Sequence, residues 1–574
     1  MMSNFHPGLI LILGGILAGI LPGRLRQASM VGAPLLALYA MFTLKVGTLW
    51  TIPFINGLEL QILKVDELSW VFGLIFSIMA LLGNIYALHN ENKGEALAGL
   101  AYAGSSLGVV FSGDWMTLIF FWELMAVSSV FLIWYRGNAQ SRGAGFRYLL
   151  VHMFGGNLLL AGIFLKITAG QPLITALTGT NDAAFWLILL GVGVNAAIPP
   201  LHAWLTDAYP EGTITGSVFL SSFTTKVAVY CLIRIFPGAT VLLWAGVIMA
   251  LYGVVYAVLE NNIRRLLAYH IISQVGFMVA GVGIGSQLAL NGATSHAYSH
   301  ILYKSLLFMS AGAVIQATGV SKLTELGGLA RKMPLVFILY TIGAFSISGV
   351  PLFNGFISKS MIISAAAYEK LPIAELLLYL ASIGTFLSIA LKLKFFMFFG
   401  TDRQLEPKPI PKNMYVAMGG GALLCTLYGI VPSLLYTYLP FDATYVPFTL
   451  DHVISSVQLM VAALIAFWIF IPKMEPKIKI SVDTDWFYRR PLIAVVKGLV
   501  WVVCTARETL ASNGMYILKQ ILPFFNNPLK WAPQTVQDEV VGDYSEDKYR
   551  FPVGTTVLMS LLVFVVTISY IWFL

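Results

Sequence analysis

Charged residues are scarce in this chain of 574 residues. Asp, Glu, Lys and Arg make up 11% of it, whereas soluble domains average about 25%. The apolar residues AVILMFWYC account for 58%, and the mean hydropathy is +0.80. So few charges cannot cover a surface in contact with water, which excludes a soluble enzyme, a disordered chain and a DNA-binding domain. The composition instead predicts a protein of the lipid bilayer, built from transmembrane helices of about 20 apolar residues.

Cysteines and cofactor motifs are also sparse. Cys231, Cys425 and Cys504 lack the spacing of metal ligands and cannot form a disulfide framework, so we predict that they are inert packing residues. The sequence has no nucleotide-binding glycine loop before a helix, no Cys/His metal motif and no convincing Ser-His-Asp set. It therefore predicts no cofactor, no metal and no enzymatic activity.

Long apolar runs recur almost to the end of the chain. They cover residues 8–22, 29–48, 68–88, 97–112, 116–135, 146–168, 184–205, 213–236, 241–259, 266–286, 293–318, 334–352, 355–368, 375–400, 413–438, 451–472 and 552–574. Some are half-spans, so we predict an all-α polytopic membrane protein with about 14–16 crossings. The first run has no basic region before it and no clear cleavage site, and is predicted to be a retained helix.

Basic residues gather in short loops between these runs. The loops after the first, fifth, ninth and eleventh runs hold Arg24 and Arg26; Arg136 and Arg142; Arg264 and Arg265; and Lys322, Arg331 and Lys332. The positive-inside rule places these loops in the cytoplasm and the N-terminus outside. The net charge of +8 is thereby explained without a nucleic-acid partner. The expected location is the inner membrane of a bacterium or archaeon.

The chain changes character near its C-terminus. Residues 473–551 are polar, and within them the helix-like stretch 491–523 is too charged for a comfortable span. We predict that this helix lies along the membrane or against a neighbouring subunit, with a tilted crossing as the alternative. The expected organisation is N-terminal helices over 1–64, a core over 65–400, further core helices over 401–472, a polar segment with a lateral helix over 473–551, and a terminal span over 552–574.

Two apolar runs contain helix-breaking residues. Pro199 and Pro200 interrupt the seventh run, and Gly349-Val350-Pro351 interrupts the twelfth. Proline removes a backbone donor, and in lipid the freed carbonyls must be satisfied by protein or by water. A pair of broken helices at corresponding places in two halves points to a transport path near the membrane midplane. A packing kink is the alternative for either break alone.

Ionisable residues deep in apolar runs are the most informative feature. Each costs roughly 2.5–3.5 kcal/mol at the bilayer centre, so such residues are rarely kept for stability alone. Glu123 is a candidate proton acceptor, with a static salt bridge as the alternative. Lys226 lies well inside its run from either end and can load and release protons when it is buried.

A third group repeats at helical spacing. His296, His300 and Lys304 follow an i, i+4, i+8 pattern, which places them on one face of the helix predicted over 293–318. The row is about 12 Å long at 1.5 Å per residue. A row of titratable groups at one-water spacing is what a proton relay needs, and histidine is the natural carrier near pH 7.

Further candidates lie close to the breaks and run ends. Lys359 follows the second break, and His202 follows the first, where it either lines water or caps freed carbonyls. His152 and Lys392 are weaker proton-path candidates. Asp207 and Glu211 are expected to cap the helix that begins at Thr213; the complete set is Asp207, Glu211, His152, His202, Lys359 and Lys392.

Four sequence stretches resemble a known family. They are Phe121–Leu124; Pro200–Ala208 with Lys226 downstream; Arg264–Gly276 with His296, His300 and Lys304; and Gly355–Lys359. Together they look like the antiporter-like subunits shared by respiratory complex I, Mrp-type cation/proton antiporters and membrane-bound hydrogenases. The resemblance covers about residues 65–400, and within the family it is greatest to the D-type component of Mrp sodium/proton antiporters.

The resemblance implies two inverted five-helix repeats, each with a broken helix, and a central row of charged residues along the membrane plane. Matched by position, the residues of that row are Glu123, Lys226, His296, His300, Lys304 and Lys359. Asn195 departs from the family, which usually carries a lysine there to pair with the glutamate. Lys226 or His152 then takes over that role, or this half couples differently. His270 also replaces a small polar residue, and either adds a proton site or hydrogen-bonds at a helix end.

The expected function is proton movement along this row, within a multisubunit Na⁺/H⁺ antiporter. The expected partners are other membrane subunits, H⁺, Na⁺ and the lipid bilayer. A proton-pumping subunit of a redox complex is one alternative, in which partner subunits hold all redox chemistry. A proton-conducting partner of a bicarbonate-accumulating complex is another.

Overall fold

The computed structural model describes residues 5–179, 181–477, 482–526, 534 and 553–573. The chain forms two compact units, Met1–Asp485 and Trp486–Leu574. Among the described residues, 11 helices are long and apolar enough to cross a membrane, and four shorter apolar helices accompany them. The all-α polytopic class predicted from composition is confirmed.

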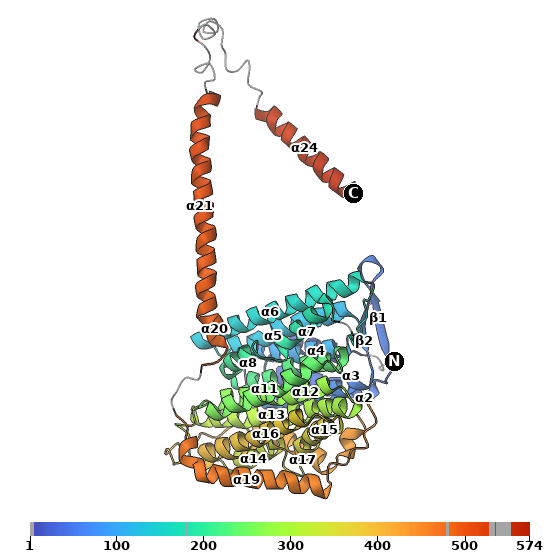
Figure 1. Ribbon diagram of the computed structural model, residues 1–574, viewed down its shortest axis with the longest axis vertical. Coiled ribbons are helices and arrows are strands. Elements are labelled where there is room, and N and C mark those ends of the chain that lie inside the picture. The colour runs from blue at the N-terminus through green and yellow to red at the C-terminus, as the bar shows by residue number, and fades with distance from the viewer. Residues whose placement is uncertain (1–4, 180, 478–481, 527–533, 535–552, 574) are drawn as a thin grey trace. The chain divides into compact units, whose positions relative to one another are not determined.

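The first unit contains almost all of the helices (Figure 1). The chain begins with α1 Pro7–Ile20, α2 Gly23–Thr43 and α3 Glu67–Ala87, with the strands β1 Leu49–Pro53 and β2 Glu59–Lys64 between α2 and α3. The core helices are α4 Lys93–Phe111, α5 Trp115–Trp134, α6 Ala139–Thr168, α7 Ala183–Asn195, α8 Ala203–Ala208, α9 Ile214–Ser222, α10 Thr224–Ile235, α11 Thr240–Leu259, α12 Ile263–Ile284, α13 Gln287–Thr318, α14 Pro334–Ser348, α15 Asn354–Tyr368 and α16 Pro372–Thr385. The π-helical stretches η3 Phe386–Leu393 and η4 Phe395–Phe399 continue α16, and α17 Lys412–Ile430, α18 Ser433–Tyr436 and α19 Leu450–Met474 follow.

Short polar side chains fix where several helices begin. Asp66, Asn92, Asp114 and Asn138 are the N-caps of α3 to α6, and each side chain accepts a hydrogen bond from the backbone amide three residues later. Such a cap satisfies an amide that has no partner inside the helix, and typically contributes about 1 kcal/mol. The starting points of the core helices are therefore set locally by the sequence.

The core helices repeat in order. A long helix, α6 or α13, is followed by a broken pair, α7–α8 or α14–α15, and then by a further span, α9–α10 or α16 with η3. Each set of five crossings starts with two ordinary helices, α4 and α5 or α11 and α12. Because five is an odd number, the second set starts on the opposite side of the membrane from the first. The two repeats are therefore inverted, as the family resemblance implies.

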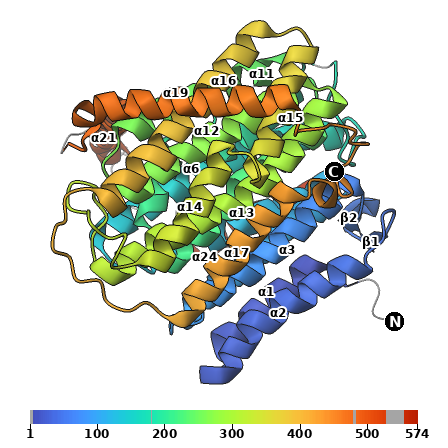
Figure 2. The same ribbon diagram turned by 90° about the horizontal axis from the view of Figure 1, so that it is seen from below.

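The helix α13 lies where the two repeats meet. It contacts α9 and α10 from the first repeat and α12, α14 and α15 from the second. Figure 2 shows α13 near the middle of the helices of the first unit. The buried stretch of α13 runs from Ala289 to Val314 almost without interruption. Residues on α13 are thus placed at the centre of the first unit.

Both predicted breaks are present. Between α7 and α8 the chain forms turns over 196–202, and between α14 and α15 it turns at Gly349, which has φ +73°. Gly355 is the second residue of α15, the second half of the broken helix, and a Cβ there would lie 1.8 Å from the backbone oxygen of Ser346. Only glycine permits this close approach of the two helix ends.

A third discontinuity was not predicted. The run 213–236 was expected to be one helix, but it divides into α9 and α10 at Phe223, which has φ −107° and ψ −70°. Another unexpected element lies in the loop 49–66, where β1 and β2 pair antiparallel. The segment has alternating apolar residues around Asn-Gly, which is a strong hairpin signal.

The second unit contains two long helices, α21 Pro491–Asn526 and α24 Val553–Phe573, and the short helix α20 Asp485–Arg489 spans the division between the units. The helix predicted over 491–523 is thus present as α21. Its apolar side chains are exposed, including Leu499 at 61% and Trp501 at 69%. An apolar surface of this size needs lipid or another subunit to cover it.

Candidate functional site

Five of the predicted relay residues are buried inside the first unit. Lys226 on α10 and His296, His300 and Lys304 on α13 are 0% exposed, and Lys359 on α15 is 3% exposed. None of these side chains faces the outer surface, where lipid would lie. Snorkelling to the membrane surface, the usual explanation for a lysine in an apolar run, therefore does not apply to them.

His300 is the electrostatic centre of this group. The charges of Lys226, His296, Lys304 and Lys359 all act on its ring, and Lys304 also interacts with Lys226 and Lys359. Among the described residues, no hydrogen-bond partner is found for either ring nitrogen of His300 or for Lys304 Nζ. Buried polar atoms without protein partners are where internal water binds in proteins. The group is therefore coupled by charge rather than locked by ion pairs.

His296 connects α13 to the second broken helix. Its Nδ1 lies 2.9 Å from Ser358 Oγ, and the Tyr303 hydroxyl lies 3.4 Å from its Nε2. Ser358 directly precedes Lys359 on α15. His296 thus contacts the side chain of the residue next to Lys359, the lysine of the second break.

Two of the lysines are held by carbonyls at helix discontinuities. Lys226 Nζ donates to the Ser221 carbonyl at 2.6 Å, beside the junction of α9 and α10. Lys359 Nζ donates to the Ile347 carbonyl at 2.7 Å. The residue four positions after Ile347 is Pro351, which has no N–H and so leaves that carbonyl free. The breaks thereby supply acceptors that a continuous helix would have used internally.

Glu123 is separate from this group. It is half-buried on α5 and lies beside Phe120 and Leu124, which are 48% and 39% exposed. No ion pair of Glu123 is found in the part of the chain that the structure describes. The static salt bridge, which was the alternative to a proton acceptor, is therefore not found there.

Aromatic and hydroxyl side chains that the sequence analysis overlooked lie in the first repeat. The His152 ring on α6 stacks on Tyr148 at 4.0 Å and meets Trp204 edge-on at 4.4 Å. The Tyr102 hydroxyl lies 2.6 Å from Thr224 Oγ1 and accepts from the Thr224 amide at 2.9 Å. The tyrosines had been counted only as apolar residues of the runs.

His152 lies near Glu123, and Thr224 lies near Lys226. His152 lies one helical turn before Gly156, which is packed against the Glu123 carboxylate, and Thr224 lies two residues before Lys226. His152 Nδ1 contacts the Tyr148 carbonyl at 3.0 Å, and its Nε2 has no hydrogen-bond partner among the described residues. This placement favours the alternative in which His152 contributes to the role that the family's lysine has at the position of Asn195, which is to pair with the glutamate.

Gly156 provides a test of the position of Glu123. A Cβ at residue 156 would lie 2.0 Å from Glu123 Oε1, the far end of a flexible side chain. Gly156→Ala is therefore expected to move the carboxylate at little cost in stability, and to lower transport at least tenfold with normal amounts of protein in the membrane. The matched control is Gly143→Ala on the same helix, where a Cβ would meet only Arg147 Nη1 at 3.3 Å. Equal transport by the two variants would contradict the importance of this position.

The remaining candidates differ in their surroundings. Asn195 is 0% exposed, and both of its amide atoms lack partners among the described residues. His270 Nε2 lies 2.7 Å from Ser388 Oγ, in the middle of α12 rather than at a helix end. Lys392 Nζ donates to the carbonyls of Val258 at 2.5 Å and Glu260 at 3.1 Å, and so satisfies the C-terminus of α11.

Asp207 and Glu211 do not cap the helix at 213. Thr213 is itself the N-cap of α9, and its hydroxyl accepts from the Gly216 amide. The two carboxylates form ion pairs instead, Asp207 with Arg147 at 2.7 Å and Glu211 with Arg136 at 2.8 Å. The capping expectation was wrong because the basic partners come from α6 and from the loop before it, far away in sequence.

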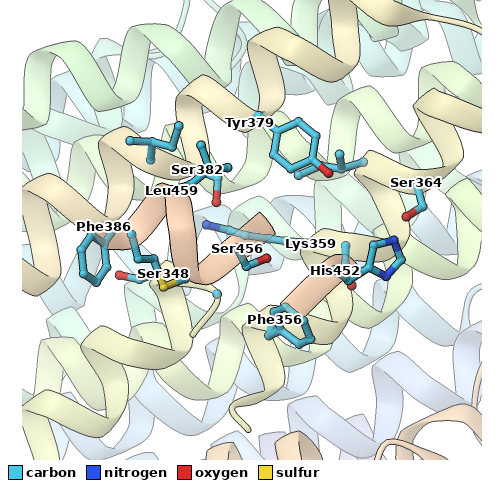
Figure 3. Close-up of a pocket in the computed structure, with 15 residues that line it drawn as sticks. Ser348, Phe356, Lys359, Ser364, Tyr379, Ser382, Phe386, His452, Ser456 and Leu459 are labelled. Atoms are coloured by element: carbon cyan, nitrogen blue, oxygen red, sulfur yellow. The ribbon is translucent and has the colours of Figure 1, made fainter. Parts of the chain in front are cut away.

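A small cavity of about 50 Å³ lies beside Lys359 (Figure 3). Its polar lining consists of Ser348, Lys359, Ser360, Ser364, Tyr379, Ser382, His452 and Ser456. These residues come from α14, α15, α16 and α19. Hydroxyl groups both donate and accept hydrogen bonds, so this lining suits water and protons better than an apolar ligand.

The fold defines a class of membrane protein: a polytopic helical protein with two inverted repeats, a broken helix in each, and a row of ionisable residues buried between them. The chain belongs to the NADH:quinone oxidoreductase/Mrp antiporter transmembrane family, whose pattern matches residues 112–388. The family resemblance drawn from the sequence motifs is thereby confirmed.

Two relatives illustrate the match. A Rhizobium meliloti protein, a probable K⁺/H⁺ antiporter component of the A/B type, is 30% identical over 65% of this chain and 40% of its own length. An uncharacterised protein of Methanocaldococcus jannaschii is 31% identical over 63% of this chain and 80% of its own length. This chain thus spans less than half of the first relative and most of the second.

Solved structures share the fold. A chain of the Mrp complex from a Dietzia species has a TM-score of 0.74 at 24% identity, covering 89% of this chain and 62% of that chain. A chain of an archaeal membrane-bound sulfane sulfur reductase has a TM-score of 0.70 at 23% identity, covering 98% of this chain and 99% of that chain. At these identities the likeness establishes the arrangement of the helices.

Proposed function

We propose that this chain is the proton-translocating membrane subunit of a multisubunit cation/proton antiporter. The observation that carries the proposal is the buried group around His300, in which Lys226, Lys304 and Lys359 interact by charge and no carboxylate of the described residues neutralises them. Buried cations of this kind are expensive to keep, and in membrane proteins they mark proton and ion pathways.

The mechanism follows from the mutual repulsion of these groups. Taking a proton on Lys226 disfavours a proton on Lys304 and His300, and a proton leaving Lys359 favours uptake by its neighbours. Each pKa unit of such coupling corresponds to about 1.36 kcal/mol. Protons therefore move along α13 as successive changes of charge, between the first repeat and the site beside Lys359, while Na⁺ or another cation moves the other way through the complex.

The proposal is tested with the intact complex in everted membrane vesicles. Addition of Na⁺ or K⁺ to vesicles with an acidic interior is expected to dissipate the pH gradient, measured by recovery of acridine dye fluorescence. Vesicles from cells without the complex serve as the control. If the purified, reconstituted complex fails to dissipate the gradient with either cation, the antiporter proposal is wrong.

A second candidate is a proton-pumping subunit of a redox complex. The nearly complete mutual coverage with a chain of a sulfane sulfur reductase complex, 98% and 99%, favours it. The subunits that purify with this chain separate the two candidates. Iron–sulfur subunits in the purified complex would establish the redox alternative, whereas small membrane subunits alone would support antiport.

A further inference from the structure

Asp483 is a buried carboxylate that the proton row does not include. It follows α19 and belongs to no helix of the first unit, yet its side chain is only 6% exposed. Its oxygens accept hydrogen bonds from His202 Nε2 at 3.1 Å, the Tyr269 hydroxyl at 2.6 Å, the Thr484 amide at 2.6 Å and the Tyr252 hydroxyl. The side-chain donors come from the first break, α11 and α12, so this site joins the end of the first unit to the first break and to the first two helices of the second repeat.

The hydrogen bonds decide the charge of this carboxylate. Burial disfavours the ionised form, but the hydrogen bond and charge of His202 and the hydroxyls of Tyr252 and Tyr269 outweigh it, and hold the pKa of Asp483 well below its usual range. Asp483 is therefore ionised near neutral pH, and an ionised carboxylate can only accept hydrogen bonds. The hydrogen between the two residues must then belong to His202 Nε2.

The other ring nitrogen of His202 is thereby left as a proton acceptor. Nδ1 is buried and has no hydrogen-bond partner among the described residues. In a neutral ring with its hydrogen on Nε2, Nδ1 carries the lone pair. A proton that binds there converts the pair from one negative charge to zero, because Asp483 at 3.1 Å neutralises the imidazolium. This pair can therefore take up a proton without adding another positive charge to the row.

The other buried carboxylates have a different setting. Glu95 lies in the first turn of α4 and accepts from the hydroxyls of Thr213 and Thr215. Asp114 is the N-cap of α5, where negative charge is favourable on its own account. Of the carboxylates that are buried in the described part of the chain, only Asp483 is paired with an imidazole.

The His202–Asp483 pair also lies at the first break, where Asn195 replaces a residue that could carry a charge. Asn195 is the last residue of α7, directly before the first break, and cannot carry a proton; His202 ends the same break. We propose that His202 is the proton carrier of the first break, and that Asp483 is the positioning residue that fixes its ring and tautomer. This inference rests on the proposed function, and it makes segment 482–484 part of the proton path.

The alternative is a purely structural contact that docks this segment, and Tyr256 allows the two roles to be separated. Its hydroxyl donates to the Val482 carbonyl at 2.9 Å and so docks the same segment without touching the carboxylate. In vesicles containing the whole complex, Asp483→Asn and His202→Gln are each expected to lower antiport at least tenfold with normal assembly. Asp483→Glu restores part of the activity, and Tyr256→Phe retains it.

The outcomes distinguish this inference from the function on which it rests. Full transport by Asp483→Asn, while Lys304→Ala has lost transport, would overturn the role of Asp483 and leave the proton-translocating function intact. Loss of transport in Tyr256→Phe as severe as in Asp483→Asn would show that only docking of the segment matters, and would also overturn the inference. Full transport in both Asp483→Asn and Lys304→Ala would count against the function itself.

Discussion

Lys304→Ala is expected to abolish antiport without preventing assembly. Lys304 interacts by charge with both Lys226 and Lys359, and its loss removes the lysine of α13, the helix where the two repeats meet. Assembly should survive, because an unpaired buried cation is costly and its removal relieves that cost. Cation-dependent recovery of the pH gradient in everted vesicles should fall to the background, with unchanged amounts of the complex on a native gel.

Lys394→Ala is the matched control for this change. Lys394 is also a lysine of an apolar run, but it is half-buried, and its ammonium lies over the ring of Phe345 at 4.9 Å. Its removal should leave transport near the level of the unmodified chain. Glu123→Ala should behave like Lys304→Ala, because Glu123 is the acidic group of the first repeat. Full transport in the Lys304→Ala vesicles would contradict the relay.

The parts of the site that the sequence predicted are those with local signals. The two breaks follow from Pro199-Pro200 and Pro351, because proline removes a donor wherever it occurs in an apolar run. The grouping of His296, His300 and Lys304 follows from helical spacing alone. Their burial was also predictable, because a charged side chain in the middle of a transmembrane run avoids the lipid by facing the protein interior.

The parts that the sequence could not predict depend on packing between distant segments. Asp483 meets His202 across 281 positions of the chain, and no periodicity relates two such residues. The ion pairs of Asp207 and Glu211 likewise depend on how α6 lies beside the first break. For Glu123, a local signal was misleading. Its position deep in an apolar run indicated a buried side chain, but the side chain is only half-buried, at the edge of the exposed face of α5.

The cavity beside Lys359 gives the other prediction with a large effect. Lys359 extends across this space with Ser382 and Ser456 on either side in Figure 3, and His452 lines the same cavity. His452 lies in the first turn of α19, and its Nδ1 lies 3.4 Å from the Tyr445 hydroxyl. From the charges of the loops, this end of α19 faces away from the cytoplasm. We therefore expect protons to exchange between Lys359 and the outside through these hydroxyls.

Ser456→Phe should block this exchange. A cavity of about 50 Å³ cannot hold both a benzyl group and the water that connects the hydroxyls. Ser456 is half-buried on α19, a helix with few buried residues, so the larger side chain can be accommodated without unfolding the core. Antiport should fall at least tenfold, measured by dye fluorescence in vesicles that contain normal amounts of the complex.

Two companion variants make the result specific to the cavity. Val457→Phe places the same ring on the next residue of α19, which is 43% exposed and does not line the cavity, and should leave transport intact. Ser456→Ala removes the hydroxyl without filling the space, and should cost far less than the ring, because the other serines and Tyr379 still hold water. If Ser456→Phe and Val457→Phe transport equally well, protons do not pass this cavity, and release from Lys359 must follow another route.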